Sequence, residues 1–197
     1  MSGQWTVPHI VFPGPGDCIC ACWVGIDGAN EDSNDILQAG TTQLLVNRFG
    51  FPPEYLSFAW FEWFPALPVT ITNFPVSPGD TMYCTICANS PTEAVVRLLN
   101  VTSGVATVFI KTAPDKIQLV GDTVEWILEA PIDANMNLAK YGDVYFDSCI
   151  AGTKSGQLIF AGAGALVPMY DVNGQVISEA SSETDQLIKV QYSGLSP

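Results

Sequence analysis

Positively charged side chains are scarce in this sequence. Lysine and arginine total 7 among 197 residues, whereas aspartate and glutamate total 20, which gives a formal net charge of −13. A surface that binds nucleic acid needs clustered cations, so we expect no nucleic-acid partner. The excess of carboxylates serves solubility or indicates adaptation to acid, because repulsion among carboxylates falls as they are protonated at about pH 4.

Histidine and long apolar runs are also nearly missing. His9 is the only histidine, which excludes a Ser-His-Asp or Cys-His catalytic site within a single chain. The longest apolar stretch, residues 158–170, is interrupted by glycines and is too short to span a bilayer, so we expect no membrane partner. No secretory signal is recognisable before the first expected strand, so an intracellular form is one expectation.

Helical periodicity is almost absent, and short β-type runs take its place. Hydrophobic residues make up 48% of the chain and charged residues 14%, so we expect a folded core. Clusters of glycine, proline, asparagine and serine separate the runs, and Asn173-Gly174 predicts a two-residue hairpin loop. The runs cover residues 81–87, 94–99, 105–111, 117–128, 143–150 and 187–192. We therefore predict an all-β protein, an antiparallel β-sandwich in a single domain over residues 1–197.

The six cysteines allow two interpretations. Cys18, Cys20 and Cys22 alternate along one expected strand and so face the same side, either as small buried hydrophobes or as disulfide partners. Cys84 and Cys87 have the spacing of a redox or metal half-site. However, residues three apart on a strand face opposite ways, and no second pair stands at zinc-finger spacing, so we expect no metal site.

Three runs of large apolar residues each carry a polar group. They are residues 23–28, which Gln38 follows ten residues later, residues 60–65 and residues 125–131. Burying a carboxylate or an amide is costly unless the group is paired or used. Three such runs in one small β-protein indicate a cleft with chemistry in it.

Strand alternation sorts the side chains of these runs onto two faces. Phe61, Trp63, Trp126 and Leu128 point to one side and can fill the core. The opposite face carries Trp60, Glu62, Phe64, Glu125, Ile127 and Glu129. If this face is hollow, it forms a groove lined with aromatic rings and with carboxylates on its floor. Any half-exposed strand has the same alternation, so an ordinary solvent-facing strand is the alternative.

Taken together, these runs make the chain similar to the fungal glutamic peptidases, also called eqolisins. Seven segments carry the resemblance in the family's order and approximate spacing, and they cover most of the chain. They are residues 5–8 (WTVP), 23–28 (WVGIDG), 36–40 (ILQAG), 60–65 (WFEWFP), 76–80 (VSPGD), 125–131 (EWILEAP) and 141–146 (YGDVYF). The resemblance implies a secreted acid endopeptidase on a concanavalin-like β-sandwich of two seven-stranded sheets. It implies a Gln–Glu dyad that acts on protein or peptide substrates without a metal or cofactor.

The resemblance assigns the dyad to Gln38 and Glu129, with Glu125 as the alternative glutamate because it projects from the same face. A carboxylate can take a proton from water and return it to the leaving amine, and an amide can donate to the oxyanion without titrating. We expect substrate contacts from Trp23, Asp27, Trp60, Glu62, Phe64 and Glu125. Phe64 departs from the family, in which tyrosine is common at this position, so a hydroxyl that would contact substrate is missing.

Two other functions are compatible with the sequence. The same tryptophans and glutamates suit a noncatalytic module that binds a carbohydrate or an extended peptide on the same fold. An assembly protein that pairs through an exposed sheet edge is the third alternative. No pattern in the sequence predicts an oligomeric state.

Overall fold

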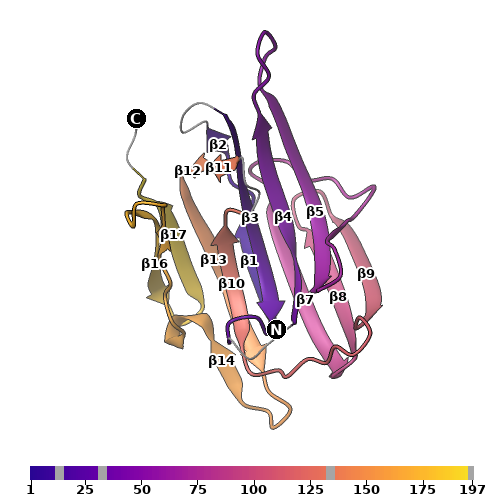
Figure 1. Cartoon of the computed structure of the whole chain (residues 1–197). Helices are drawn as coiled ribbons and strands as arrows, with labels where there is room; N and C mark the ends of the chain where they lie inside the picture. The colour runs from indigo at the N-terminus through magenta and orange to yellow at the C-terminus, as the bar shows by residue number, and fades with distance from the viewer. Residues whose placement is uncertain (12–15, 31–34, 132–135, 195–197) are drawn as a thin grey trace.

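The computed structural model describes residues 1–11, 16–30, 35–131 and 136–194. Over these residues the chain forms two large β-sheets that pack face to face, one of nine strands and one of six, together with a two-stranded sheet (Figure 1). This part of the chain contains no α-helix, only a 3-10 turn at Ala161–Ala163. The predicted all-β sandwich of two large sheets is confirmed. Within the described residues, no helix is long and apolar enough to cross a membrane.

The N-terminal strand lies in the middle of the nine-stranded sheet. Strand β1 pairs antiparallel with β13 on one side and with β7 on the other. The order along the sheet is β15-β16-β17-β13-β1-β7-β8-β9, and β14 pairs with β13. The strands are β1 (Ser2–Thr6), β7 (Thr81–Ser90), β8 (Glu93–Asn100), β9 (Val105–Thr112), β13 (Asp143–Gly152), β14 (Leu158–Phe160), β15 (Met169–Tyr170), β16 (Val176–Thr184) and β17 (Leu187–Tyr192).

The six-stranded sheet carries all three runs that the sequence singles out. Its order is β10-β3-β4-β5-β6, and β11 joins β3 in the one parallel pairing among the described strands. The strands are β3 (Asp17–Ile26), β4 (Ile36–Val46), β5 (Glu54–Phe64), β6 (Val69–Thr70), β10 (Val124–Glu129) and β11 (Met136–Leu138). Strands β2 (Ile10–Val11) and β12 (Lys140–Tyr141) form the two-stranded sheet. The two sheets thus differ from the seven-plus-seven arrangement that the resemblance implies, because short strands such as β14 and β15 extend the larger one.

The core between the sheets is built from one face of each strand. On β3 the alternation turns Cys18, Cys20 and Cys22 inward, where all three are buried. The other core side chains include Leu37, Leu45, Phe61, Trp63 and Leu128 from the smaller sheet and Trp5, Met82, Ile86, Val96, Leu98, Val144 and Phe146 from the larger one. The Trp5 indole N–H also donates a buried hydrogen bond of 3.0 Å to Thr41 Oγ1, which ties the two sheets together.

All six cysteines are free thiols. Burial raises the pKa of Cys20 and of Cys84 to about 12, so these thiols remain neutral and act as small apolar side chains. Cys84 is buried whereas Cys87 is exposed, as expected for residues three apart on a strand. In the part of the chain that the structure describes, no group of three or more His, Cys, Asp or Glu side chains is placed to hold a metal.

Two local predictions were wrong. The strand expected over residues 117–128 begins only at Val124. The hairpin loop at Asn173-Gly174 spans residues 171–175 rather than two residues. Asp171 widens this loop because its carboxylate accepts hydrogen bonds from the backbone N–H groups of Asn173 and Gln175.

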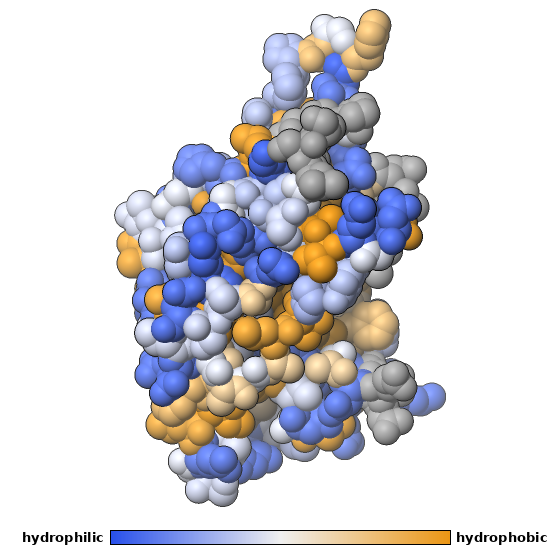
Figure 2. Space-filling view, turned by 90° about the vertical axis from the view of Figure 1, so that its left-hand side faces the viewer, coloured by the Kyte–Doolittle hydropathy of each residue, from blue (hydrophilic) through white to orange (hydrophobic). Residues whose placement is uncertain are grey.

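The hairpin between β4 and β5 rises beyond the body of the sandwich (Figure 1 and Figure 2). Phe49 and Phe51 lie in the connection between the two strands, and both are exposed. Both strands run from this tip down into the sheet, where they carry Gln38 and Glu62. The same hairpin therefore sets the register of the candidate site.

Candidate active site

Strands β10, β3, β4 and β5 present one face away from the core, which we call the outer face. Strand pairing places Glu125, Gly25, Gln38 and Glu62 in a single row across it. The next two rows are Ile127–Trp23–Gly40–Trp60 and Glu129–Ala21–Thr42–Phe58. Because side chains two residues apart on a strand share a face, Gln38 and the singled-out glutamates and tryptophans lie on one surface.

Two glycines allow Trp23 to lie close to the sheet. A Cβ added at Gly25 would come within 2.8 Å of Trp23 Cζ3. A Cβ added at Gly40 would come within 2.2 Å of the Cys22 carbonyl oxygen and 2.5 Å of Trp23 Cβ. Both Trp23 and Trp60 are buried as a result, although they face away from the main core. Gly40 lies between them, so the two indoles flank a narrow strip of backbone.

Gln38 and Glu62 form a short hydrogen bond across neighbouring strands. The Gln38 Nε2 donates to Glu62 Oε2 over 2.6 Å, and this contact orients the amide. Burial raises the pKa of Glu62, while the hydrogen bond from Gln38 lowers it in part. Gln38 itself is buried. Strand pairing fixes its backbone, and the hydrogen bond to Glu62 orients its side-chain amide.

Three buried polar atoms near this pair lack a hydrogen-bond partner among the described residues. They are Gln38 Oε1, Trp23 Nε1 and Trp60 Nε1. Buried polar groups in folded proteins are normally paired, so such a concentration on one surface calls for a physical explanation. Two donors and one acceptor on the floor of the outer face can bind a water molecule or the backbone of a peptide.

Glu129 belongs to this group, although its backbone lies two rows from that of Gln38. Burial raises the pKa of Glu129, the Trp23 indole N–H lowers it, and the charge of Glu62 raises it again. The Glu129 carboxyl is therefore within electrostatic reach of both Trp23 and Glu62. The approach of the Trp23 indole falls short of hydrogen-bond geometry, so its N–H is still able to donate elsewhere.

Glu125 stands in the same row as Gln38, but its carboxyl is engaged at the other end of the face. Thr123 Oγ1 donates to Glu125 Oε1 over 3.2 Å. Burial raises the pKa of Glu125 to about 7; the bond from Thr123 lowers it, and the charge of Asp27 raises it. The surroundings of the two glutamates thus differ: the carboxyl of Glu129 interacts with Trp23 and Glu62, and that of Glu125 with Thr123 and Asp27.

Asp27 has surroundings that differ from those expected of a substrate contact. Its side chain is fully buried, and its two oxygens accept hydrogen bonds of 2.8–3.0 Å from the backbone N–H groups of Val120, Gly121 and Asp122. Its own φ of 66° lies in the left-handed region that closes a tight turn. Asp27 therefore anchors the 120–122 loop, and this loop replaces the first part of the strand expected over residues 117–128.

Phe64 lies at one end of the outer face, opposite Ile36, and is half exposed. Phe58 lies on the same face of β5 and packs with Trp23 and Trp60. Sequence reasoning did not single out Phe58 or Gly40. Extending the alternation of β5 back from Trp60, and that of β4 onward from Gln38, identifies both positions.

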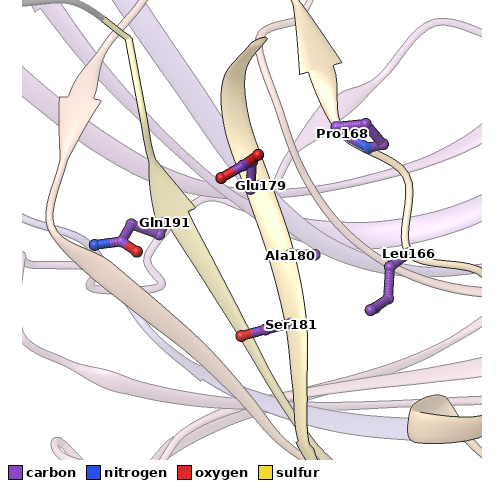
Figure 3. A pocket seen from close by; sticks show the side chains of 6 residues that line it. All are labelled: Leu166, Pro168, Glu179, Ala180, Ser181 and Gln191. Atoms are coloured by element: carbon purple, nitrogen blue, oxygen red, sulfur yellow. The ribbon is translucent and has the colours of Figure 1, made fainter.

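A hollow lies on the larger sheet, apart from the outer face. It is lined by Leu166, Pro168, Glu179, Ala180, Ser181 and Gln191 (Figure 3). Glu179 and Gln191 stand opposite one another on β16 and β17, but both are exposed. Among the residues that the structure describes, no aromatic side chain lines this hollow. On the outer face, by contrast, the Gln38 amide and the glutamate carboxyls share a surface with Trp23 and Trp60.

The fold and the outer face define a β-sandwich protein with an amide–carboxylate site between two tryptophans. The sequence model of the Peptidase A4 family matches residues 1–192. The chain belongs to this family, and the resemblance to the glutamic peptidases is confirmed.

Curated relatives come from two fungi. Aspergillopepsin-2 from Aspergillus niger is 28% identical over 172 residues, which cover 85% of this chain and 58% of the relative. Scytalidopepsin B from Scytalidium lignicola is 32% identical over 82 residues, which cover 42% of this chain and 28% of the relative. The chain thus spans little more than half the length of the first relative and under a third of that of the second.

Solved structures of two peptidases share the fold. Aspergilloglutamic peptidase from Aspergillus niger superposes with a TM-score of 0.76 at 24% identity, over 89% of this chain and 99% of that one. Scytalido-glutamic peptidase, solved with a transition state analog inhibitor, superposes with a TM-score of 0.80 at 22% identity, over 97% and 90% of the two chains. At these identities the likeness shows that the sandwich architecture is common to all three.

The close packing at Gly40 predicts a large effect from a single methyl group. We expect Gly40→Ala to lower the free energy of unfolding by about 1–3 kcal/mol, because the obstructing atoms include backbone. Gly142→Ala is the matched control, since a Cβ there meets nothing within 4 Å. Denaturant midpoints measure both changes. Equal midpoints for Gly40→Ala and wild type would contradict the proposed packing of Trp23.

The environment of Glu125 predicts that the fold is more stable in acid. A carboxyl whose pKa is raised to about 7 stabilises the fold fully below its unfolded value of about 4.5, and this contribution is lost as the pH rises through about 7. We expect Glu125→Gln to increase the free energy of unfolding by about 1–2 kcal/mol at pH 8, a value reduced for screening by water at a partly exposed group, and by much less at pH 4. The control Glu179→Gln alters an exposed carboxyl. The prediction fails if the two variants respond alike to pH.

Proposed function

We propose that this protein is an acid-active endopeptidase that hydrolyses peptide bonds with Gln38, Glu129 and a water molecule. The observation that carries the proposal is the buried Gln38 amide, bonded to Glu62 at 2.6 Å beside the two indole N–H groups that lack partners. Membership of the Peptidase A4 family supports the reaction class. The proposal includes each reaction step given below, and it takes proteins or peptides as the substrates.

In this reaction the Glu129 carboxylate accepts a proton from water as the water oxygen attacks the peptide carbonyl carbon. The carbonyl oxygen becomes negatively charged and accepts a hydrogen bond from the Gln38 amide. The protonated Glu129 then donates its proton to the peptide nitrogen, and the carbon–nitrogen bond breaks. The intermediate is tetrahedral and noncovalent, and the protein supplies the proton transfer and the oxyanion contact from its own side chains.

Glu62 positions the amide in this scheme. An amide Nε2 carries two hydrogens, so Gln38 donates one to Glu62 and retains the second for the oxyanion. Glu62 also acts on Glu129 through its charge, which raises the pKa of the Glu129 carboxyl. Glu62 is therefore a positioning residue with an electrostatic effect on the base.

The burial of Glu129 sets the direction of the pH dependence. Its raised pKa means that the carboxylate form, which serves as base, forms at a higher pH than in a solvent-exposed glutamate. A raised pKa also increases the fraction of Glu129 that is protonated at a given pH, which favours its role as the acid for the leaving amine. Activity is thus expected in mildly acidic solution, with an acid limb that reports the ionisation of Glu129.

Loss of either dyad residue is the direct test. We expect Gln38→Ala to reduce cleavage of denatured casein by about 10²–10³-fold, because one oxyanion donor is removed. Glu129→Gln, which removes the base while keeping the shape, should reduce it by about 10²–10⁴-fold. Initial rates across the acid range measure both effects, with circular dichroism to check that the variants are folded.

The matched controls change the same residue types at exposed positions. Gln157→Ala and Glu179→Gln should retain wild-type rates. Normal activity in either dyad variant would refute the assignment. If the folded wild-type chain binds peptide or carbohydrate but cleaves no substrate at acid or neutral pH, the protein is a noncatalytic binding module.

The electrostatic link between Glu62 and Glu129 predicts a shift in the pH profile. In Glu62→Gln the new amide oxygen still accepts the hydrogen bond from Gln38, but the negative charge is gone. Removing a charge that raises the pKa of Glu129 lowers that pKa, so the acid limb of kcat/KM should move to lower pH. Glu54→Gln, at the exposed far end of the same strand, serves as control and should leave the profile unchanged. A Glu62→Gln profile that coincides with that of wild type would contradict the link.

A further inference from the structure

The outer face continues beyond the proposed catalytic group as an apolar surface. Leu44 on β4 stands directly opposite Leu56 on β5, and Phe58 lies two residues farther along β5 toward Trp60. Leu56 is 39% exposed, and Leu44 and Phe58 are half-buried. We call Leu44, Leu56 and Phe58 the apolar platform. No reaction step described above uses these three residues.

The apolar platform adjoins the proposed catalytic group. Phe58 shares a row of the sheet with Glu129, and it packs with Trp23 and Trp60. Side chains on one face of a strand repeat at roughly 7 Å, and so do alternate side chains of an extended peptide. A peptide held with one bond beside Gln38 and Glu129 therefore brings a nearby side chain over the platform.

The charged groups described beside the apolar platform are mostly carboxylates. The carboxyl groups of Glu62 and Glu129 lie on its catalytic side, and Glu54 lies one row beyond Leu56 on the same face. Arg48, the nearest cation along this hairpin, pairs with Glu54 at 3.9 Å. An acidic substrate side chain would meet repulsion from these carboxylates, and Arg48 already pairs with Glu54. A large apolar side chain would instead cover the exposed part of Leu56.

We propose that the apolar platform is a substrate subsite that selects peptides with a large apolar side chain, such as leucine or phenylalanine, close to the cleaved bond. This inference rests on the proposed function, because it names the substrate class of the same site. Leu56 and Phe58 are the specificity-determining residues, and they act by binding the substrate rather than by moving protons.

The test uses the full chain and a set of peptides with a uniform small, neutral background. A single variable residue, leucine, serine or aspartate, is moved through the positions on both sides of the cleaved bond. At one of these positions we expect kcat/KM for leucine to exceed that for serine by about tenfold or more, which is the discrimination that an apolar pocket provides. Aspartate should fall below serine at the same position.

Variants connect this preference to the platform. We expect Leu56→Ser and Phe58→Ser each to reduce the leucine-over-serine ratio of kcat/KM several-fold, mainly through KM for the leucine peptide. Leu158→Ser, which changes an exposed leucine on the other sheet, should leave the ratio intact. Leu56 is partly exposed, so its variant remains informative if Phe58→Ser does not fold.

The outcomes separate this inference from the proposed function. Cleavage without any apolar preference, or a preference that both platform variants retain, overturns the subsite while the peptidase proposal stands. If no peptide and no casein is cleaved, the peptidase proposal fails. Tryptophan fluorescence titrations with the same peptides then decide on the subsite. Tighter binding of the leucine peptide that Leu56→Ser abolishes supports it, and equal binding of all three peptides overturns it.

Discussion

The hydrogen bond between Gln38 and Glu62 is the interaction on which the site depends. It joins side chains 24 residues apart in sequence, and it exists only because β4 and β5 pair in one register. A slip of one residue would turn Glu62 into the core and bring Trp63 outward. Burial of Leu37, Phe61 and Trp63 opposes such a slip, so the packing that stabilises the sandwich also aligns the amide with its carboxyl.

The outer face carries several features that cost stability. A buried donor or acceptor without a partner costs about 1–3 kcal/mol, and Gln38, Trp23 and Trp60 each contribute one such atom. Gly25 and Gly40 add backbone that is entropically costly to order, yet only glycine admits the Trp23 indole there. These costs fall on the face that is not packed against the second sheet. The side chains of Gln43 and Trp63, which face the core, also have buried donors without a partner among the described residues, so such atoms are not confined to the outer face.

The sequence alone predicts which side chains share a face of a strand, but it does not predict which residues pair across neighbouring strands. Alternation alone separates Glu62 from Trp63, because the period of a strand is two. It carries no information on which residue of β4 faces Glu62, since that depends on the length of the connection around Phe49 and Phe51. The loop at residues 120–122 was missed for a related reason. The backbone N–H groups of this loop donate to the buried carboxylate of Asp27 instead of to a neighbouring strand. The apolar character of the run does not reveal that its hydrogen-bond acceptor lies 93 residues away.

The choice of an amide beside the glutamates has an electrostatic consequence. A lysine or arginine in place of Gln38 would stabilise an oxyanion more strongly, but it would also lower the pKa of Glu129. A carboxyl with a lowered pKa returns its proton to a leaving amine poorly, because the acid form is scarce during turnover. The neutral amide leaves burial and the charge of Glu62 to raise the pKa of Glu129. One carboxyl group can then serve in the proposed reaction as base and afterwards as acid. The scarcity of cations in this chain, 7 in 197 residues, is thus consistent with the proton chemistry proposed for the outer face.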